Sequence, residues 1–177
     1  PVSNDALSIL IADDHPLFRG ALHQVINQLY PMATLHEAAD VAELQQQAER
    51  SKRVHLLLLD LHMPGALGYS ALSWFTGHYP DTPAIMISAN AHPDTVRRAL
   101  DHGAAGFLSK SVGIEDMADC IGRVMAGERG LHPGLDAHGK GASLQSLDVA
   151  EALALEEDLR LVAAVPRPTV DDDRVVR

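Results

Sequence analysis

Cysteine is nearly absent from this chain, since Cys120 is the only one among 177 residues. An internal disulfide is therefore excluded, and a lone thiol is typical of proteins from a reducing cytoplasm. Long apolar runs are missing as well, because no stretch approaches the roughly 20 residues that a membrane-spanning helix requires. The opening segment PVSNDALS has neither a basic region nor a long apolar run. We therefore expect no signal peptide, no membrane contact and a cytoplasmic location.

Positive charge is also scarce. Lys and Arg number 14 against 24 Asp and Glu, which gives a formal net charge of −10 at pH 7. Because proteins bind nucleic acid largely by neutralising phosphates with basic side chains, this composition argues against direct DNA binding. Hydrophobic residues make up 46% of the chain, which is enough for a core. The length suggests one domain with an appendage or two very small domains.

Short apolar runs alternate five times with longer amphipathic segments in the first 127 residues. The apolar runs predict strands at 7–12, 34–39, 54–60, 83–88 and 105–110. The segments that follow them predict helices from Pro16, at 40–50, up to about His78, at 93–103 and at 113–127. Such an alternation predicts an open parallel sheet with helices on both faces.

Several helix ends carry recognisable signals. Pro16 fits a first turn, Asp40 is a candidate N-cap, and Gly103 fits the position just after a helix. In the first helix, the apolar spacing predicts a core face of Leu17, Ala21, Leu22, Val25, Ile26 and Leu29. In the last helix, it predicts a face of Ile114, Met117, Ala118, Ile121, Val124 and Met125.

Residues 128–177 differ from the rest in composition. The stretch GERGLHPGLDAHGKGAS contains five glycines and is typical of a linker. Residues 144–164 could form a helix, although Asp148, Glu151 and Asp158 project into its apolar face. The last segment, PRPTVDDDRVVR, has the composition of a disordered tail.

Polar side chains stand at the carboxyl ends of four predicted strands. Asp13 and Asp14 follow the first strand, and Asp60, Ser88 and Lys110 end the third, fourth and fifth. In an open parallel sheet these ends share one edge, which is where ligands bind. Three crowded carboxylates repel one another, so we expect a divalent cation such as Mg²⁺ among them. Beside a cation and a lysine, one carboxylate could act as a nucleophile toward phosphorus. His15 and His62 lie near this pocket by position.

Four motifs occur in the expected order: ADDHPLFR, LLLLDLHMPGALG, IMISA and GFLSKS. As a set they resemble the receiver domain of two-component response regulators. The DDHP start and the ending AAGFLSKSVGIEDMADCIGRVMAGE are most similar to the NarL/LuxR-type subfamily. The resemblance implies a receiver domain at residues 1–127 with a flavodoxin-like (βα)5 fold. In that doubly wound sheet the strand order is 2-1-3-4-5, and a C-terminal linker and helical tail follow it.

The resemblance also implies a role for each motif residue. Asp60 would be the phosphoacceptor. The ligands of Mg²⁺ (or Mn²⁺) would be Asp13, Asp14, Asp60 and the backbone carbonyl of His62, with Asp14 bound directly. The residues that contact the phosphoryl group or switch with it would be Ser88, Ala89, Lys110 and Phe107.

A sensor histidine kinase would supply the phosphate, and phosphorylation would switch dimerisation or output. Self-phosphorylation from a donor and autodephosphorylation would be the only reactions. The subfamily normally continues into a helix-turn-helix domain and acts in transcription, but residues 128–177 contain no recognisable DNA-binding segment. DNA contact would therefore need an output domain that is not evident here. A homodimer is possible, through the first and fifth helices or through the fourth and fifth.

Two other functions remain open on the sequence alone. A stand-alone or truncated receiver could act as a protein-interaction module without phosphorylation. An aspartate-nucleophile phosphohydrolase is disfavoured, because that class needs a second Asp where His62 stands, and the chain has no cap insertion.

Overall fold

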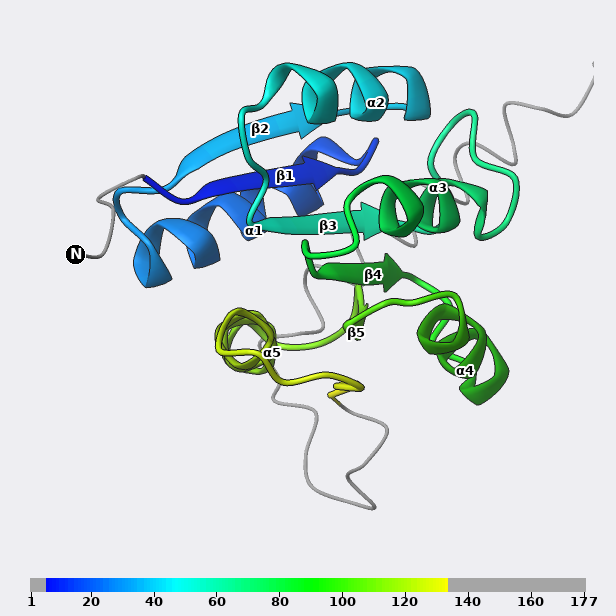
Figure 1. Cartoon of the computed structure of the whole chain (residues 1–177). Coiled ribbons are helices and arrows are strands. Elements are labelled where there is room, and N and C mark those ends of the chain that lie inside the picture. The colour runs from blue at the N-terminus through cyan, green and yellow to red at the C-terminus, as the bar shows by residue number, and fades with distance from the viewer. Residues whose placement is uncertain (1–5, 134–177) are drawn as a thin grey trace, which may run out of the picture.

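The computed structural model describes residues 6–133, which form one five-stranded parallel sheet with five helices (Figure 1). The strands are β1 (Ser8–Ala12), β2 (Thr34–Ala38), β3 (Leu56–Asp60), β4 (Ala84–Ser88) and β5 (Gly106–Ser109). The helices are α1 (Pro16–Leu29), α2 (Val41–Arg50), α3 (Ser70–His78), α4 (Pro93–Asp101) and α5 (Ile114–Met125). The strand order is β2-β1-β3-β4-β5, which confirms the predicted fold. The predicted helix at 144–164 and the predicted tail lie outside the described residues.

Helices cover both faces of the sheet. Leu56 and Leu58 of β3 pack in the cluster formed with α1 and α5. Leu57 and Leu59 pack in the opposite cluster with α2, α3 and α4. Successive strand residues point to opposite faces, so a strand buried on both sides must be apolar throughout. Cys120 lies on the core side of α5, where burial raises the pKa of its thiol to about 12.

The local signals for helix ends are confirmed. Pro16 is the first residue of α1, and Gly103 follows α4 with a φ of +97°. The Asp40 carboxylate accepts a hydrogen bond from the Glu43 backbone N–H, and the Glu43 carboxylate accepts one from the Ala39 N–H. This reciprocal arrangement satisfies one backbone donor in the first turn of α2 and one just before its N-cap.

The predicted core faces of α1 and α5 are wrong at three positions. Leu17, Leu29 and Ile114 are 55%, 36% and 53% exposed, whereas Phe18 is 1% exposed. The three exposed residues belong to the first or last turn of their helices. The buried stripe of α1 is instead Phe18, Leu22, Val25 and Ile26. Apolar spacing alone did not separate Leu17 from its neighbour Phe18.

The segment after α5 returns to the sheet and pairs with the outer edge of β5. Leu131 forms a parallel bridge with Gly106, and its carbonyl accepts a hydrogen bond of 2.7 Å from the Phe107 N–H. The Gly130 N–H donates to the Ala105 carbonyl at 2.8 Å. A Cβ atom on Gly106 would lie 3.1 Å from the Leu131 carbonyl oxygen, so glycine permits this close approach. The edge of β5 is therefore covered by the chain itself.

Among residues 6–133, no helix combines the length and apolar character needed to cross a bilayer.

Candidate functional site

The carboxyl edge of the sheet brings together acidic side chains from two neighbouring strands. Asp13 and Asp14 directly follow β1, and Asp60 is the last residue of β3. Asp13 is 0% exposed and Asp60 is 2% exposed. Within the described part of the chain, Asp13, Asp14, His15 and Asp60 place ligand atoms within 4.8 Å of one another. The predicted convergence of these carboxylates is therefore observed.

Lys110 supplies the positive charge of this site. It directly follows β5 and is 6% exposed, and its backbone N–H donates to the Ser88 carbonyl. Its Nζ atom lies 2.9 Å from Asp60 Oδ2 and 3.0 Å from Asp13 Oδ2. One ammonium group thus faces two buried carboxylates, and Asp14 adds a third carboxylate to the same cluster.

The crowded, buried surroundings of Asp13 disfavour its ionised form. Burial raises the pKa of its carboxyl above the usual range, Lys110 lowers it, and Asp60 raises it further. Its buried Oδ2 atom is paired with the Lys110 ammonium group at 3.0 Å. A buried donor set of carboxylate oxygens with excess negative charge fits a hard divalent cation. The residues present therefore suit Mg²⁺ or Mn²⁺.

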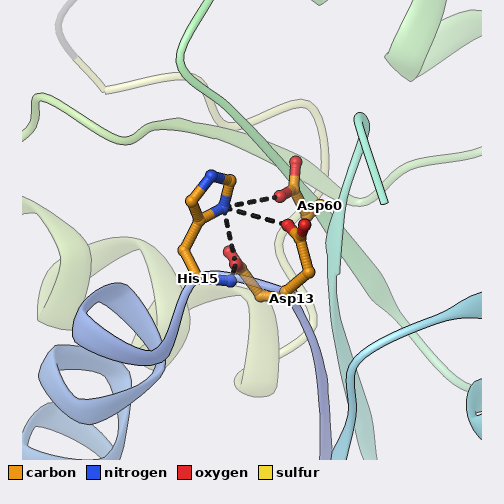
Figure 2. Close-up of side chains that lie close together, drawn as sticks. Asp13, His15 and Asp60 are labelled. Atoms are coloured by element: carbon orange, nitrogen blue, oxygen red, sulfur yellow. Dashed lines mark hydrogen bonds and ion pairs between the residues drawn. The ribbon is translucent and has the colours of Figure 1, made fainter. Parts of the chain in front are cut away.

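His15 reaches further into the site than its sequence position alone indicated. Its backbone N–H donates to Asp13 Oδ1 at 2.7 Å, and its ring points toward the carboxylates (Figure 2). Ring atom Nδ1 lies 3.1 Å from both Asp13 Oδ1 and Asp14 Oδ1, and 3.4 Å from Asp60 Oδ2. The same atom is 2.7 Å from Lys110 Nζ.

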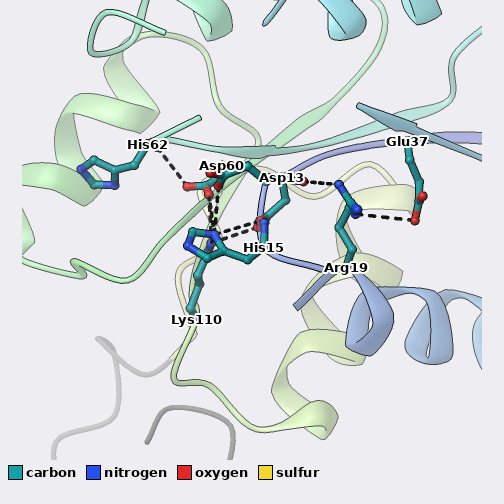
Figure 3. Close-up of polar contacts among 8 residues, drawn as sticks. Asp13, His15, Arg19, Glu37, Asp60, His62 and Lys110 are labelled. Carbon is teal, nitrogen blue, oxygen red and sulfur yellow. Dashed lines mark hydrogen bonds and ion pairs between the residues drawn. The ribbon is translucent and has the colours of Figure 1, made fainter. Parts of the chain in front are cut away.

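Backbone contacts hold the acidic residues in place. The His62 N–H donates to Asp60 Oδ1 at 3.0 Å, while the exposed His62 ring points away from the cluster (Figure 3). Arg19 Nη1 donates to the Asp13 carbonyl at 2.9 Å, and its Nε atom lies 3.8 Å from Glu37 Oε1. Sequence reasoning missed Arg19, although it is the last residue of the motif ADDHPLFR. One helical turn after Pro16, it is well placed to reach back to the end of β1.

The other predicted residues belong to β4, the loop after it and β5. Ser88 ends β4, is 0% exposed, and accepts a hydrogen bond from the Asn90 N–H. Ala89 follows it and is exposed. Phe107 is 1% exposed and packs in the core cluster that α2, α3 and α4 cover. Ser88 and Ala89 thus lie at the carboxyl end of β4, next to β3 in the sheet, whereas Phe107 lies within β5.

A 2-1-3-4-5 sheet with buried carboxylates and a lysine at its carboxyl edge defines the receiver class of signalling domains. Residues 9–122 match the family model described as the response regulator receiver domain, so the chain belongs to this family. Receiver domains of response regulators are generally non-enzymatic signalling modules. The resemblance to the NarL/LuxR type is also confirmed, because NarL proteins are among its relatives.

The glycerol metabolism activator of Pseudomonas putida is 38% identical over 125 residues, covering 71% of this chain and 57% of that protein. The nitrate/nitrite response regulator NarL of Escherichia coli K12 is 31% identical over 133 residues, covering 75% and 61%. The receiver domain of a NarL response regulator from Mycobacterium tuberculosis superimposes with a TM-score of 0.61 at 28% identity, covering 70% of this chain and 98% of that structure. The chain spans less than two thirds of the length of these two curated relatives.

Proposed function

We propose that Asp60 accepts a phosphoryl group from a sensor histidine kinase. The observation that carries the proposal is the buried contact of 2.9 Å between Lys110 Nζ and Asp60 Oδ2. An ammonium group in this position neutralises the carboxylate before transfer and can pair with phosphoryl oxygens after it. The family match over residues 9–122 supports the same chemistry.

The proposed transfer is a displacement at phosphorus. A carboxylate oxygen of Asp60 attacks phosphorus, a P–O bond forms, and the P–N bond of a phosphohistidine donor breaks. The electron pair of that bond stays on the donor's imidazole, and an acyl phosphate remains on Asp60. Lys110 then faces the phosphoryl oxygens from its position beside Asp60. Apart from this self-phosphorylation and slow loss of the phosphate to water, we propose no catalytic activity.

The acidic cluster would hold Mg²⁺ or Mn²⁺ during the transfer. Asp14 would bind it directly, together with Asp60 and the backbone carbonyl of His62, and Asp13 would lie next to it. When bound, the ion offsets negative charge on the carboxylates and on the incoming phosphoryl group. The excess of carboxylates over ammonium groups supports this assignment.

The remaining predicted residues would convert phosphorylation into a structural change. The Ser88 hydroxyl and the Ala89 backbone would engage the phosphoryl group, and the Phe107 ring would change position as they do. Ser88 and Lys110 already share a backbone hydrogen bond, which supports coupled movement of β4 and β5. Phosphorylation would then shift the population toward a form with a different face at α4, β5 and α5.

We propose a receiver unit at residues 1–127, followed by a linker and tail at 128–177, in a cytoplasmic protein. The partners would be a sensor histidine kinase and a second copy of the chain. Transcriptional control would require an output domain, because the net charge of −10 disfavours direct DNA contact by these residues. A relative from Pseudomonas putida named transcriptional activator protein ExaE supports a transcriptional role for the whole protein.

The test is intact-mass spectrometry after incubation with Mg²⁺ and acetyl phosphate or phosphoramidate. We expect a single phosphoryl adduct on the wild-type chain and none on Asp60→Asn. Asp119→Asn is the matched control, because Asp119 is 62% exposed and pairs with Arg123 on the surface of α5. An adduct that persists on Asp60→Asn, or no adduct on the wild type, would contradict the proposal.

A further inference from the structure

The imidazole of His15 lies within the acidic cluster. Its Nδ1 atom lies 3.1, 3.1 and 3.4 Å from oxygens of Asp13, Asp14 and Asp60. A ring nitrogen carries at most one proton, so it can donate to one of these acceptors and not to all three. Figure 2 shows this atom turned toward the carboxylates of Asp13 and Asp60.

Lys110 restricts the ring further. Its ammonium group has only donors, and it lies 2.7 Å from Nδ1, so this contact requires a lone pair on that nitrogen. In the structure this lone pair faces the Lys110 ammonium group. It is equally available to a divalent ion held by the neighbouring carboxylates.

The spacing of the atoms agrees with metal ligation. Around an octahedral ion with bonds of about 2.1 Å, neighbouring ligand atoms are about 3.0 Å apart. The distances of 3.1 Å from Nδ1 to Asp13 and Asp14 match this edge, and the distance of 3.4 Å to Asp60 is slightly longer. Asp13 is fully buried and belongs to the same cluster.

The backbone of His15 is fixed by the sequence around it. The residue precedes Pro16, which favours an extended conformation, and its φ and ψ are −97° and 103°. Its N–H donates to Asp13 Oδ1 at 2.7 Å, and its side chain is 14% exposed. The ring is therefore held at the site before any ion arrives.

We propose that His15 Nδ1 is a nitrogen ligand of the metal site and gives it a preference for first-row transition ions. Imidazole suits such ions, whereas Mg²⁺ is bound mainly through oxygen atoms. Co²⁺ and Zn²⁺ would therefore bind through Nδ1 as well as the carboxylates, and Mg²⁺ would depend on oxygen ligands, the carboxylates and the His62 backbone carbonyl. The inference rests on the metal site of the proposed function, and it adds a ligand and a selectivity to that site.

The first test is titration of the untagged full chain with Co²⁺, followed by its visible ligand-field absorption. We expect His15→Ala to raise the Co²⁺ dissociation constant at least about tenfold and to change the spectrum, with less than about threefold change for Mg²⁺. His78→Ala is the matched control, because that exposed ring on α3 contacts the Trp74 carbonyl and does not belong to the acidic cluster. Displacement of Co²⁺ by Mg²⁺ distinguishes this site from surface histidines.

A second measurement uses the wild-type chain and does not depend on how the variant folds. Long-range ¹H–¹⁵N spectra of the histidine rings should show the His15 Nδ1 resonance shifting when Zn²⁺ is added. An unshifted Nδ1 resonance would overturn the inference. So would equal Co²⁺ affinities and spectra for wild type and His15→Ala, or tighter binding of both ions by that variant.

The two proposals can fail separately. Phosphorylation of Asp60 in Mg²⁺ together with His15-independent Co²⁺ binding would reject the nitrogen ligand and leave the phosphoacceptor intact. Co²⁺ binding that depends on His15, with no phosphoryl adduct on Asp60, would support the nitrogen ligand and reject the phosphoacceptor.

Discussion

Lys110 and Asp60 form a buried ion pair of 2.9 Å between residues 50 positions apart in the sequence. The same ammonium group also lies 3.0 Å from Asp13, so one cation stabilises carboxylates from β1 and β3. The carboxyl edge of the sheet is thus held by an electrostatic contact that depends on β5 being in place.

Replacing Lys110 with Ala should destabilise the protein, because it leaves two buried carboxylates without their cation. We expect a loss of about 3 kcal/mol in the free energy of unfolding in metal-free buffer, measured by urea denaturation. Saturating Mg²⁺ should restore part of it, since the ion binds the native site. Lys52→Ala, at an exposed position after α2, is the control and should change little. An equal effect of both variants would contradict the assigned role of Lys110.

The raised pKa of Asp13 predicts a pH dependence of stability. Because the folded state holds the Asp13 proton more tightly than the unfolded chain, stability should fall as pH rises through the window between the two pKa values. Asp13→Asn should remove the cost of ionising this buried carboxyl, so the free energy of unfolding should change less with pH in that window. At neutral pH without metal, we expect this variant to unfold at a higher urea concentration than the wild type.

The control for Asp13 is Asp81→Asn, an exposed position in the loop before β4. It should leave the pH profile as it is in the wild type. If Asp13→Asn were less stable than the wild type at neutral pH without metal, the electrostatic account of the site would be wrong.

Arg19 should stabilise the end of β1 through its hydrogen bond to the Asp13 carbonyl. Arg19→Ala removes a charged donor from a partly buried acceptor, so we expect a loss of about 1–3 kcal/mol in urea denaturation. Arg97→Ala is the comparison, because that side chain is 69% exposed and pairs with Asp94 on the surface of α4. Equal stability of the two variants would show that the Arg19 contact is not formed in solution.

Gly106→Ala should weaken the pairing between β5 and the segment after α5. The new Cβ would lie 3.1 Å from the Leu131 carbonyl oxygen, so this carbonyl has to move away. We expect faster hydrogen exchange at the Phe107 amide, which donates to that oxygen. Gly122→Ala in α5 is the matched control, because nothing lies within 4 Å of its added Cβ. That variant should be stabilised by about 0.5–1 kcal/mol and keep its Phe107 protection.

Much of the architecture could be predicted because its signals are local. The run of leucines in β3 indicates a strand buried on both faces, and Pro16 and Asp40 mark helix starts by their own chemistry. The convergence of Asp13, Asp60 and Lys110 followed from the topology, since parallel strands end at one edge.

The features that escaped prediction depend on contacts between distant segments. The glycines around Leu131 indicated a linker, but its pairing with β5 requires the open edge that only the folded sheet provides. The choice of Phe18 over Leu17 as a core residue depends on how α1 sits against the sheet. The direction of the His15 ring depends on the carboxylates and ammonium group that surround it.

The bridge between Gly106 and Leu131 has a mechanical consequence. Leu131 is hydrogen-bonded directly to β5, the strand that precedes Lys110. A shift of β5 along or across the sheet is therefore passed directly to the backbone at Leu131. The residues that follow Leu131 therefore begin at a point that moves with Lys110.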